Sequence, residues 1–143
     1  MIRTADCLPL FFFDPETTAV GMAHAGWRGI KKGIISRMLE MFQKGFESSL
    51  SSLRVGIGPA ICRSCYEVGE EFLNYFPGFV ERSGEKYFCD LHGVVKKQLV
   101  DWGIKQENVF DSGFCTACSV DQFFSARREG RDTGRLISAI LLK

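Results

Sequence analysis

The fold is decided by residues 4–29, TADCLPLFFFDPETTAVGMAHAGWRG. Residues 8–13 form a continuous apolar run, residues 14–17 have the composition of a turn, and residues 18–23 are apolar and β-branched. This pattern predicts two antiparallel strands joined by a short loop. The two polar motifs at the ends of the hairpin, TADCLP and HAGWRG, are thereby brought near one another.

Counting along this hairpin suggests a functional pair. If residues 14–17 form the loop, Phe13 faces Thr18, and the same register sets Cys7 opposite His24. Directly opposite side chains share a face, with Cβ atoms about 4.5–5.5 Å apart. A thiol and an imidazole at that separation suit two ligands of one metal ion, or a thiolate with its base. A five-residue loop would instead place them on opposite faces, and a lone buried cysteine would be a small core residue.

Length and composition predict one compact cytoplasmic domain. The chain has 143 residues, of which 45% are hydrophobic, enough for a substantial core. Its net charge of +1 gives no electrostatic argument for nucleic acid or an anionic membrane as a partner. The longest apolar stretches fall short of the roughly 20 residues of a membrane span, and the N-terminus lacks the features of a signal peptide. Six cysteines in a reducing compartment are expected to be thiols or metal ligands.

Helices and strands alternate loosely over the rest of the chain. Apolar spacing with glycine or proline stops predicts helices at 29–44, 66–76 and 91–102, the last capped by Asp90. The predicted strands are 53–58, 87–89, 108–111 and 136–142, the last of them buried. Because the first strand pair is antiparallel, a mixed-sheet α/β domain over residues 1–143 fits better than a parallel Rossmann-type sheet.

Two basic features are candidates for binding an anion. The helix predicted at 29–44 begins beside Arg28, so its N-terminal amides and this guanidinium could hold phosphate. The alternative is that Gly26 and Gly29 only permit a tight turn from strand to helix. Four more arginines fall within residues 127–135, either as a solvated loop or as forks for phosphate or carboxylate.

Two C-x-x-C pairs, at 62–65 and 115–118, suggest a second metal site. Four cysteines in such pairs are typical of structural zinc. Against this reading, 49 residues (66–114) separate the pairs, more than the usual spacing of about 15–20. The alternative is that two loops approach at one edge of a sheet without a metal, with Cys115 near the wall of the active site. His92 has no ligand-like neighbour and is expected to be a surface or partly buried residue.

Taken together, the motifs resemble the YfiH-like family, long labelled multicopper polyphenol oxidase or laccase domain. They span nearly the whole chain in the expected order. The motifs are TADCLP (4–9), HAGWRG (24–29), GIGPAI (56–61), YEV (66–68), CT (115–116), FFS (123–125), RR (127–128) and TGR (133–135). Ala126 departs from the family pattern, in which an aromatic residue precedes the two arginines and forms one wall of the pocket.

The resemblance implies a layered α/β/β/α fold with mixed sheets, like that of the cytotoxic necrotizing factor deamidases. It also implies a zinc site in which Cys7 and His24 are joined by a second histidine from an earlier part of longer relatives. Since the chain begins three residues before the cysteine motif, we expect a unit truncated at its N-terminus. Exposed sheet edges in such a unit would favour instability or association into a homo-oligomer.

The implied activity is purine nucleoside phosphorolysis, in which adenosine or inosine and phosphate give the base and ribose 1-phosphate. Adenosine deaminase and methylthioadenosine phosphorylase side activities accompany it. Cys7 and His24 would hold zinc, with copper as the alternative. Asp6 would orient a ligand or shuttle a proton, and Arg28 would bind phosphate.

Three other functions stay open. A copper-dependent polyphenol oxidase needs many histidines, whereas this chain has two. A cysteine hydrolase would use Cys7 as nucleophile and His24 as base. A non-catalytic, zinc-stabilised interaction domain would use the two C-x-x-C pairs.

Overall fold

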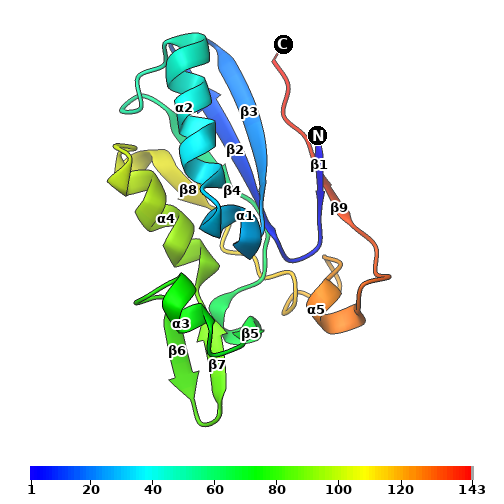
Figure 1. The fold of residues 1–143 in the computed structure, drawn as a ribbon. Helices are drawn as coiled ribbons and strands as arrows, with labels where there is room; N and C mark the ends of the chain where they lie inside the picture. The colour runs from blue at the N-terminus through cyan, green and yellow to red at the C-terminus, as the bar shows by residue number, and fades with distance from the viewer. Residues whose placement is uncertain (143) are drawn as a thin grey trace.

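A four-stranded mixed sheet forms the centre of the molecule (Figure 1). The computed structural model describes residues 1–142. In spatial order the strands are β3 (Ala19–Ala25), β2 (Leu8–Asp14), β4 (Arg54–Ile57) and β8 (Val109–Asp111). β2 is antiparallel to both of its neighbours, whereas β4 and β8 are parallel. The predicted α/β fold with mixed sheets is confirmed.

Two smaller sheets flank the central one. The first and last strands, β1 (Ile2–Thr4) and β9 (Leu136–Ser138), pair antiparallel and bring the two ends of the chain together (Figure 1). The other sheet has the order β5-β7-β6. Its strands are β5 (Glu67–Val68), β6 (Val80–Ser83) and β7 (Lys86–Cys89). The β6–β7 hairpin projects away from the central sheet in Figure 1.

The helices lie mainly over one face of the central sheet. The two long ones, α2 (Ile34–Phe46) and α4 (Leu91–Asp101), are neighbours there (Figure 1). The shorter helices are α1 (Trp27–Lys31), α3 (Phe72–Tyr75) and α5 (Ala126–Glu129), with 3-10 turns η1 (Arg63–Cys65) and η2 (Gln106–Asn108). None of the helices described within residues 1–142 is long and apolar enough to cross a membrane.

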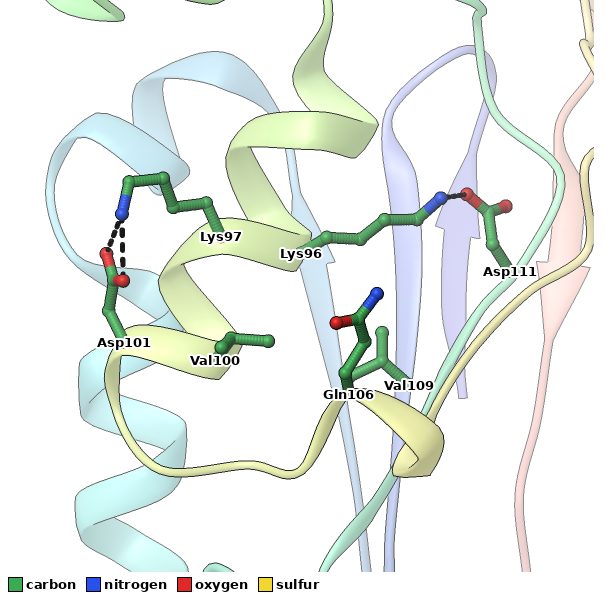
Figure 2. Close-up of a pocket in the computed structure, with 7 residues that line it drawn as sticks. All are labelled: Lys96, Lys97, Val100, Asp101, Gln106, Val109 and Asp111. Carbon is green, nitrogen blue, oxygen red and sulfur yellow. Dashed lines mark hydrogen bonds and ion pairs between the residues drawn. The ribbon is translucent and has the colours of Figure 1, made fainter.

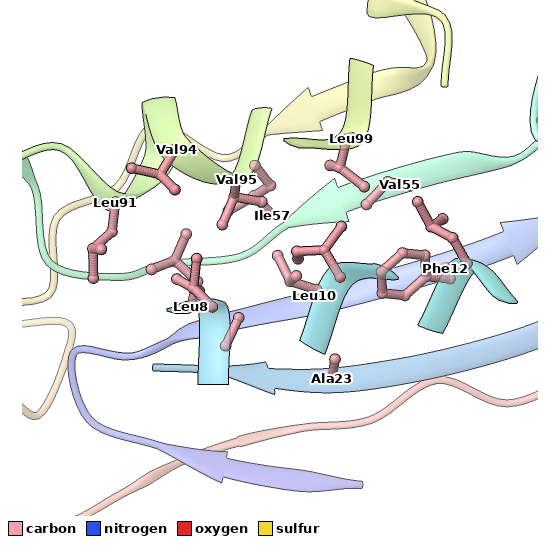
Figure 3. Packing of buried hydrophobic residues seen from close by; sticks show 14 of the residues in the cluster. Leu8, Leu10, Phe12, Ala23, Val55, Ile57, Leu91, Val94, Val95 and Leu99 are labelled. Carbon is pink, nitrogen blue, oxygen red and sulfur yellow. The ribbon is translucent and has the colours of Figure 1, made fainter. Parts of the chain in front are cut away.

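The core fills the space between the sheet and these helices. Alternate residues of a strand point to the same face, and Leu8, Leu10 and Phe12 of β2 are all completely buried on the helical side. Figure 3 shows them packed against Val95 and Leu99 of α4. The apolar spacing that predicted strand and helix therefore also identified the faces that meet in the core.

The turn of the first hairpin lies one residue further along than predicted. Asp14 pairs with Ala19, so the loop is residues 15–18 instead of 14–17. The Asp14 carboxylate accepts hydrogen bonds from the Glu16 backbone N–H (2.9 Å) and from the Thr17 hydroxyl (2.8 Å). These bonds let Asp14 end the strand and direct the turn at once.

This change corrects the predicted pairing of the two motifs. His24 lies opposite Pro9, and the same register carried to the motif sets Cys7 opposite Gly26. The direct pairing of Cys7 with His24 was therefore wrong. Since the displacement is two residues, and side chains alternate with period two, both stay on one face of the hairpin.

The helix predicted at 29–44 is two helices. Gly33 has φ +80°, in the left-handed region, and this residue ends the first helical segment and begins α2. α2 also continues through Gly45, where a stop was predicted, and ends at Glu47, whose φ is +55°.

Two further predictions were wrong in extent. The helix predicted at 66–76 is only α3, because Glu67 and Val68 pair with β7 as strand β5. The closing strand predicted at 136–142 is only β9 and is not buried, with Ile137 65% exposed. The predicted α4, capped by the Asp90 carboxylate bound to the Gly93 N–H, is confirmed.

Candidate active site

The cysteine motif makes a sharp corner between β1 and β2. Asp6 sits there with φ +84° and a buried side chain. Its two carboxylate oxygens accept hydrogen bonds from the Thr116 hydroxyl and from the Arg127 backbone N–H, both at 2.7 Å. Its carbonyl oxygen accepts another from the Ile61 N–H at 3.0 Å. Asp6 thus holds the loop after β4, the loop after β8 and α5 against the start of β2.

Cys7 follows this corner and packs against the second motif. A Cβ atom at position 26 would lie only 2.9 Å from the Cys7 Sγ, so glycine at that position gives the thiol its space. Burial raises the pKa of the Cys7 thiol, and the charge of Asp6 raises it further. The thiolate form therefore needs compensation by a cation or a metal ion.

His24 is exposed on β3, on the same face of the hairpin as Cys7. A thiolate and an imidazole are a donor set suited to zinc or copper. Within residues 1–142, no third histidine, cysteine or carboxylate forms a close group with these two. Their residue types and their shared face make the two residues a candidate for part of a metal site.

Tyr66 is half-buried, and its pKa responds to Cys7 and to two guanidiniums. The Arg127 guanidinium lies 5.4 Å from the centre of the Tyr66 ring and donates to the Glu67 carbonyl at 2.8 Å. Burial raises the pKa of Tyr66 strongly; the Cys7 charge adds to this, while Arg127 and Arg28 oppose it. Positive charge therefore acts at Tyr66, from Arg127 by contact and from Arg28 without a direct contact, and this charge would favour an anion there.

Arg28 is available for such an anion, but not through a long helix. The residue is exposed, with its guanidinium 4.4 Å from the centre of the Trp27 ring. α1 has only five residues, so its dipole adds little to binding, and α2 starts after Gly33, away from the motif. The side chains of Arg28 and Arg127, and not the amides at a helix start, are therefore the candidates for binding an anion.

The other arginines of residues 127–135 have different roles. The Arg128 guanidinium donates to the carbonyls of Thr116 (2.8 Å), Ala117 (3.0 Å) and Phe123 (2.6 Å). Arg135 likewise donates to backbone carbonyls of its own segment. The side chains of Arg128 and Arg135 therefore hold loops, whereas Arg127 contacts the Tyr66 ring. Its role had no local sequence signal beyond the arginine-rich segment itself.

A surface cavity of about 440 Å³ lies elsewhere, between α4 and β8 (Figure 2). Its two lysines are neutralised, Lys96 by Asp111 at 2.7 Å and Lys97 by Asp101 at 2.8 Å. His92, partly buried as predicted, contacts the same Asp111 through Nδ1 at 3.0 Å. The cavity contains none of the motif residues, so we keep the site at the Cys7 corner.

The two C-x-x-C pairs, by contrast, do meet. Their four Sγ atoms all lie within 4.8 Å of one another. All six cysteines, which lie within the described residues, are free thiols. The two cysteine-containing loops therefore come together in the folded chain, which the sequence left open.

Comparison with known proteins identifies the family. The family model described as multi-copper polyphenol oxidoreductase laccase matches residues 1–143. The chain belongs to this family. The solved structure of hypothetical protein YfiH from Bacillus licheniformis superimposes with a TM-score of 0.87 at 35% identity, over 93% of this chain and 53% of that one. The predicted membership of the laccase-like YfiH family is confirmed.

Named relatives are nucleoside enzymes. Purine nucleoside phosphorylase YlmD of Bacillus subtilis is 34% identical over 147 residues, which cover 97% of this chain and 53% of the relative. Adenosine deaminase RL5, from an unknown prokaryotic organism, is 33% identical over 99% of this chain and 56% of the relative. The chain thus spans about half the length of the curated relatives it matches.

Proposed function

We propose that this chain is part of a purine nucleoside phosphorylase, which converts adenosine or inosine and phosphate to the base and ribose 1-phosphate. The observation that carries the proposal is the placement of Cys7 and the exposed His24 on one face of the first hairpin. The Arg127 N–H binds the Asp6 carboxylate next to Cys7, and the Arg127 guanidinium lies over the Tyr66 ring. These residues offer a candidate pair of metal ligands and a cation. The names of the relatives supply the substrate class.

In this proposal Cys7 and His24 hold zinc, with copper as the alternative metal. When bound, the metal supplies Lewis-acid polarisation of the purine or activates a water molecule. Phosphorolysis forms a bond from a phosphate oxygen to C1′ of the ribose as the glycosidic C–N bond breaks. The base leaves with the electron pair of that bond and takes up a proton.

The protein side chains position and neutralise the reactants. Arg28 and Arg127 bind the phosphate dianion, because the planar guanidinium group offers paired donors that match phosphate oxygens. Asp6 is assigned as a positioning residue, since both of its carboxylate oxygens already accept hydrogen bonds. Through the corner at Asp6, these bonds orient the Cys7 thiol.

Adenosine deaminase and methylthioadenosine phosphorylase activities are proposed for the same site. The deaminase would use metal-activated water in place of phosphate, and the relative RL5 bears that activity in its name. The compartment proposed is the cytoplasm, which keeps thiol ligands reduced. Residues 1–143 are proposed to form a single unit that associates into a homo-oligomer through its exposed sheet edges.

Two alternatives have less support. A multicopper oxidase centre would need more histidines than His24 and His92, and His92 is bound to Asp111 at the α4–β8 edge. A cysteine hydrolase would need a readily formed thiolate, whereas burial raises the pKa of Cys7.

The proposal is tested with inosine and phosphate. Zinc-loaded protein is incubated with both, and ribose 1-phosphate is quantified, with the Bacillus subtilis relative assayed in parallel. We expect product from the wild type and a loss of more than about tenfold in Cys7→Ala. Cys89→Ala is the matched control, because it removes a buried thiol that has no assigned role.

A second pair of variants tests the phosphate assignment. Arg127→Gln should raise the KM for phosphate, whereas Arg54→Gln, on the exposed end of β4, should leave it unchanged. Absence of ribose 1-phosphate with the wild type, or equal activity in Cys7→Ala, would refute the proposed function.

A further inference from the structure

Four thiols that are distant in the sequence meet where β4 and β8 end. We call this group the cysteine cluster; it consists of Cys62, Cys65, Cys115 and Cys118. We propose that the cysteine cluster binds one structural zinc ion, which fastens the loop after β4 to the loop after β8. This site is separate from the Cys7–His24 pair and does not rest on the proposed function.

The spacing of the sulfur atoms matches one tetrahedral ion. A zinc–sulfur bond of about 2.3 Å in a tetrahedron places the sulfur atoms about 3.8 Å apart. The Cys62 and Cys118 Sγ atoms lie 3.9 Å apart, those of Cys65 and Cys118 lie 3.2 Å apart, and no pair exceeds 4.8 Å. Separations this small leave room for a single ion.

The fold explains why a long separation in sequence does not prevent the site. β4 and β8 are parallel, so their carboxyl ends lie at the same edge of the sheet. The pairing continues as a bridge between Ala60 and Cys115, with hydrogen bonds from the Ala60 N–H to Phe114 and from the Thr116 N–H to Ala60. Each C-x-x-C pair therefore leaves the sheet from the same place.

Each pair is then folded back on itself by a tight turn. In the first pair the Cys65 N–H donates to the Cys62 carbonyl at 3.1 Å, as part of η1. In the second, the Ser119 N–H donates to the Cys115 carbonyl at 3.0 Å. These turns hold both sulfur atoms of a pair on the same side, as a common ion requires.

Backbone amides already point at one of the sulfur atoms. The N–H groups of Cys62 and Cys118 both donate to the Cys115 Sγ, at 3.3 and 3.4 Å. Such hydrogen bonds orient a sulfur ligand toward the metal ion that it binds. On binding, Zn²⁺ replaces four thiol protons, which pass to solvent, and no electron is transferred.

The ion would act on the corner that carries Cys7. The loop after β4 donates the Ile61 N–H to the Asp6 carbonyl, and the loop after β8 donates the Thr116 hydroxyl to the Asp6 carboxylate. Arg128 adds bonds to Thr116 and Ala117 of the second loop. Zinc between the two loops would therefore restrict the groups that donate hydrogen bonds to Asp6.

Cobalt substitution tests the site without any measurement of activity. Protein purified with a reductant is stripped of metal and titrated with Co²⁺, and thiolate-to-cobalt charge-transfer absorption is followed. The Cys7→Ser variant, which lacks the thiol of the other candidate site, should keep one strongly absorbing Co²⁺ per chain. Zinc should displace it stoichiometrically, and elemental analysis of the protein as isolated should give about one zinc for this site.

Substitutions in the cysteine cluster should abolish the signal. Cys62→Ser and Cys118→Ser, each combined with Cys7→Ser, should bind Co²⁺ at least tenfold more weakly. Cys118 is exposed, so this substitution does not disturb the core. Cys118→His, which retains a ligand atom, should keep the metal with a weaker charge-transfer band.

Several outcomes would overturn the proposal. Absorption unchanged by Cys62→Ser and Cys118→Ser would place the metal elsewhere, and a fully reduced protein that binds no Co²⁺ would exclude the site. A mass lower by two hydrogen atoms, with a Cys65–Cys118 cross-link in protein kept under reductant, would show a disulfide instead. Stoichiometric iron in the isolated protein would show that the cluster serves another metal.

Discussion

Replacing Gly26 by alanine should disturb Cys7 through a single added methyl group. The Cβ would lie 2.9 Å from the Cys7 Sγ, well inside the usual contact distance of about 3.5–4.0 Å, and the thiol would have to move. Gly26 has φ −81° and ψ 163°, which alanine adopts without strain, so the backbone adds no cost. Overpacking of this kind costs about 1–3 kcal/mol in the free energy of unfolding.

Gly45→Ala serves as a control for the cost of the close contact at position 26. Gly45 lies in α2 with nothing within 4 Å of the position of a Cβ, so Gly45→Ala should stabilise the protein by about 1 kcal/mol, through a more restricted unfolded chain and the higher helix propensity of alanine. Gly26→Ala gains about 0.4–1 kcal/mol from the unfolded chain and loses about 1–3 kcal/mol to the contact. Gly26→Ala should therefore be less stable than Gly45→Ala by about 1–3 kcal/mol.

Urea denaturation of both variants gives the free energies, and the rate of Cys7 alkylation reports on the thiol itself. We expect Gly26→Ala to be the less stable variant and to change the alkylation rate, while Gly45→Ala keeps the wild-type rate. Equal stabilities together with an unchanged rate would refute the close contact between the two motifs.

Three further variants test other parts of the structure. Asp6→Asn replaces an acceptor oxygen by a donor opposite two hydrogen-bond donors and should cost about 1–3 kcal/mol by urea denaturation, unlike the control Asp132→Asn in an exposed turn. Burial raises the pKa of Asp111, but hydrogen bonds outweigh this effect and hold the pKa below its usual value. The ionised Asp111 therefore stabilises the protein above about pH 4, and this stabilisation is lost as the pH falls further. Asp111→Asn should make the stability, measured by circular dichroism, depend less on pH in the acid range. Phe12→Ala should cost about 3–5 kcal/mol, against less than about 0.5 kcal/mol for the exposed Phe110→Ala, and equal midpoints would contradict the assigned core.

The sequence predicted elements better than it predicted their limits. The apolar run and its return identified the first hairpin, but its register depended on the two hydrogen bonds made by the Asp14 side chain. Apolar spacing identified the helical face around α2, yet nothing in the pattern marked Gly33 as the residue with a left-handed conformation. Val68, Phe72 and Phe76 have helical spacing, but the pairing of Glu67 and Val68 with β7 overrides that local tendency at the start of the segment.

For the candidate site, too, only part of the arrangement could be predicted from the sequence. Cys7, His24 and Arg28 were predicted as site residues from their types within two compact motifs, and this assignment stays a prediction. The approach of Arg127 to Tyr66 was not predicted, because the two residues are far apart in the chain and only the folded structure brings them together. The C-x-x-C pairs were judged by their separation in sequence, whereas the parallel pairing of β4 and β8 decides their distance in space.

The pairing of β1 with β9 has a consequence for the order of folding. Residues 5–135 lie between these two strands, so joining them closes a long loop, at a high cost in chain entropy. The hairpin and the helices that cover it depend on nearer partners and are expected to form earlier. Asp6 is likewise held by Thr116 and Arg127, which are distant in the sequence. The corner at Asp6 is therefore expected to be completed late, after the core has folded.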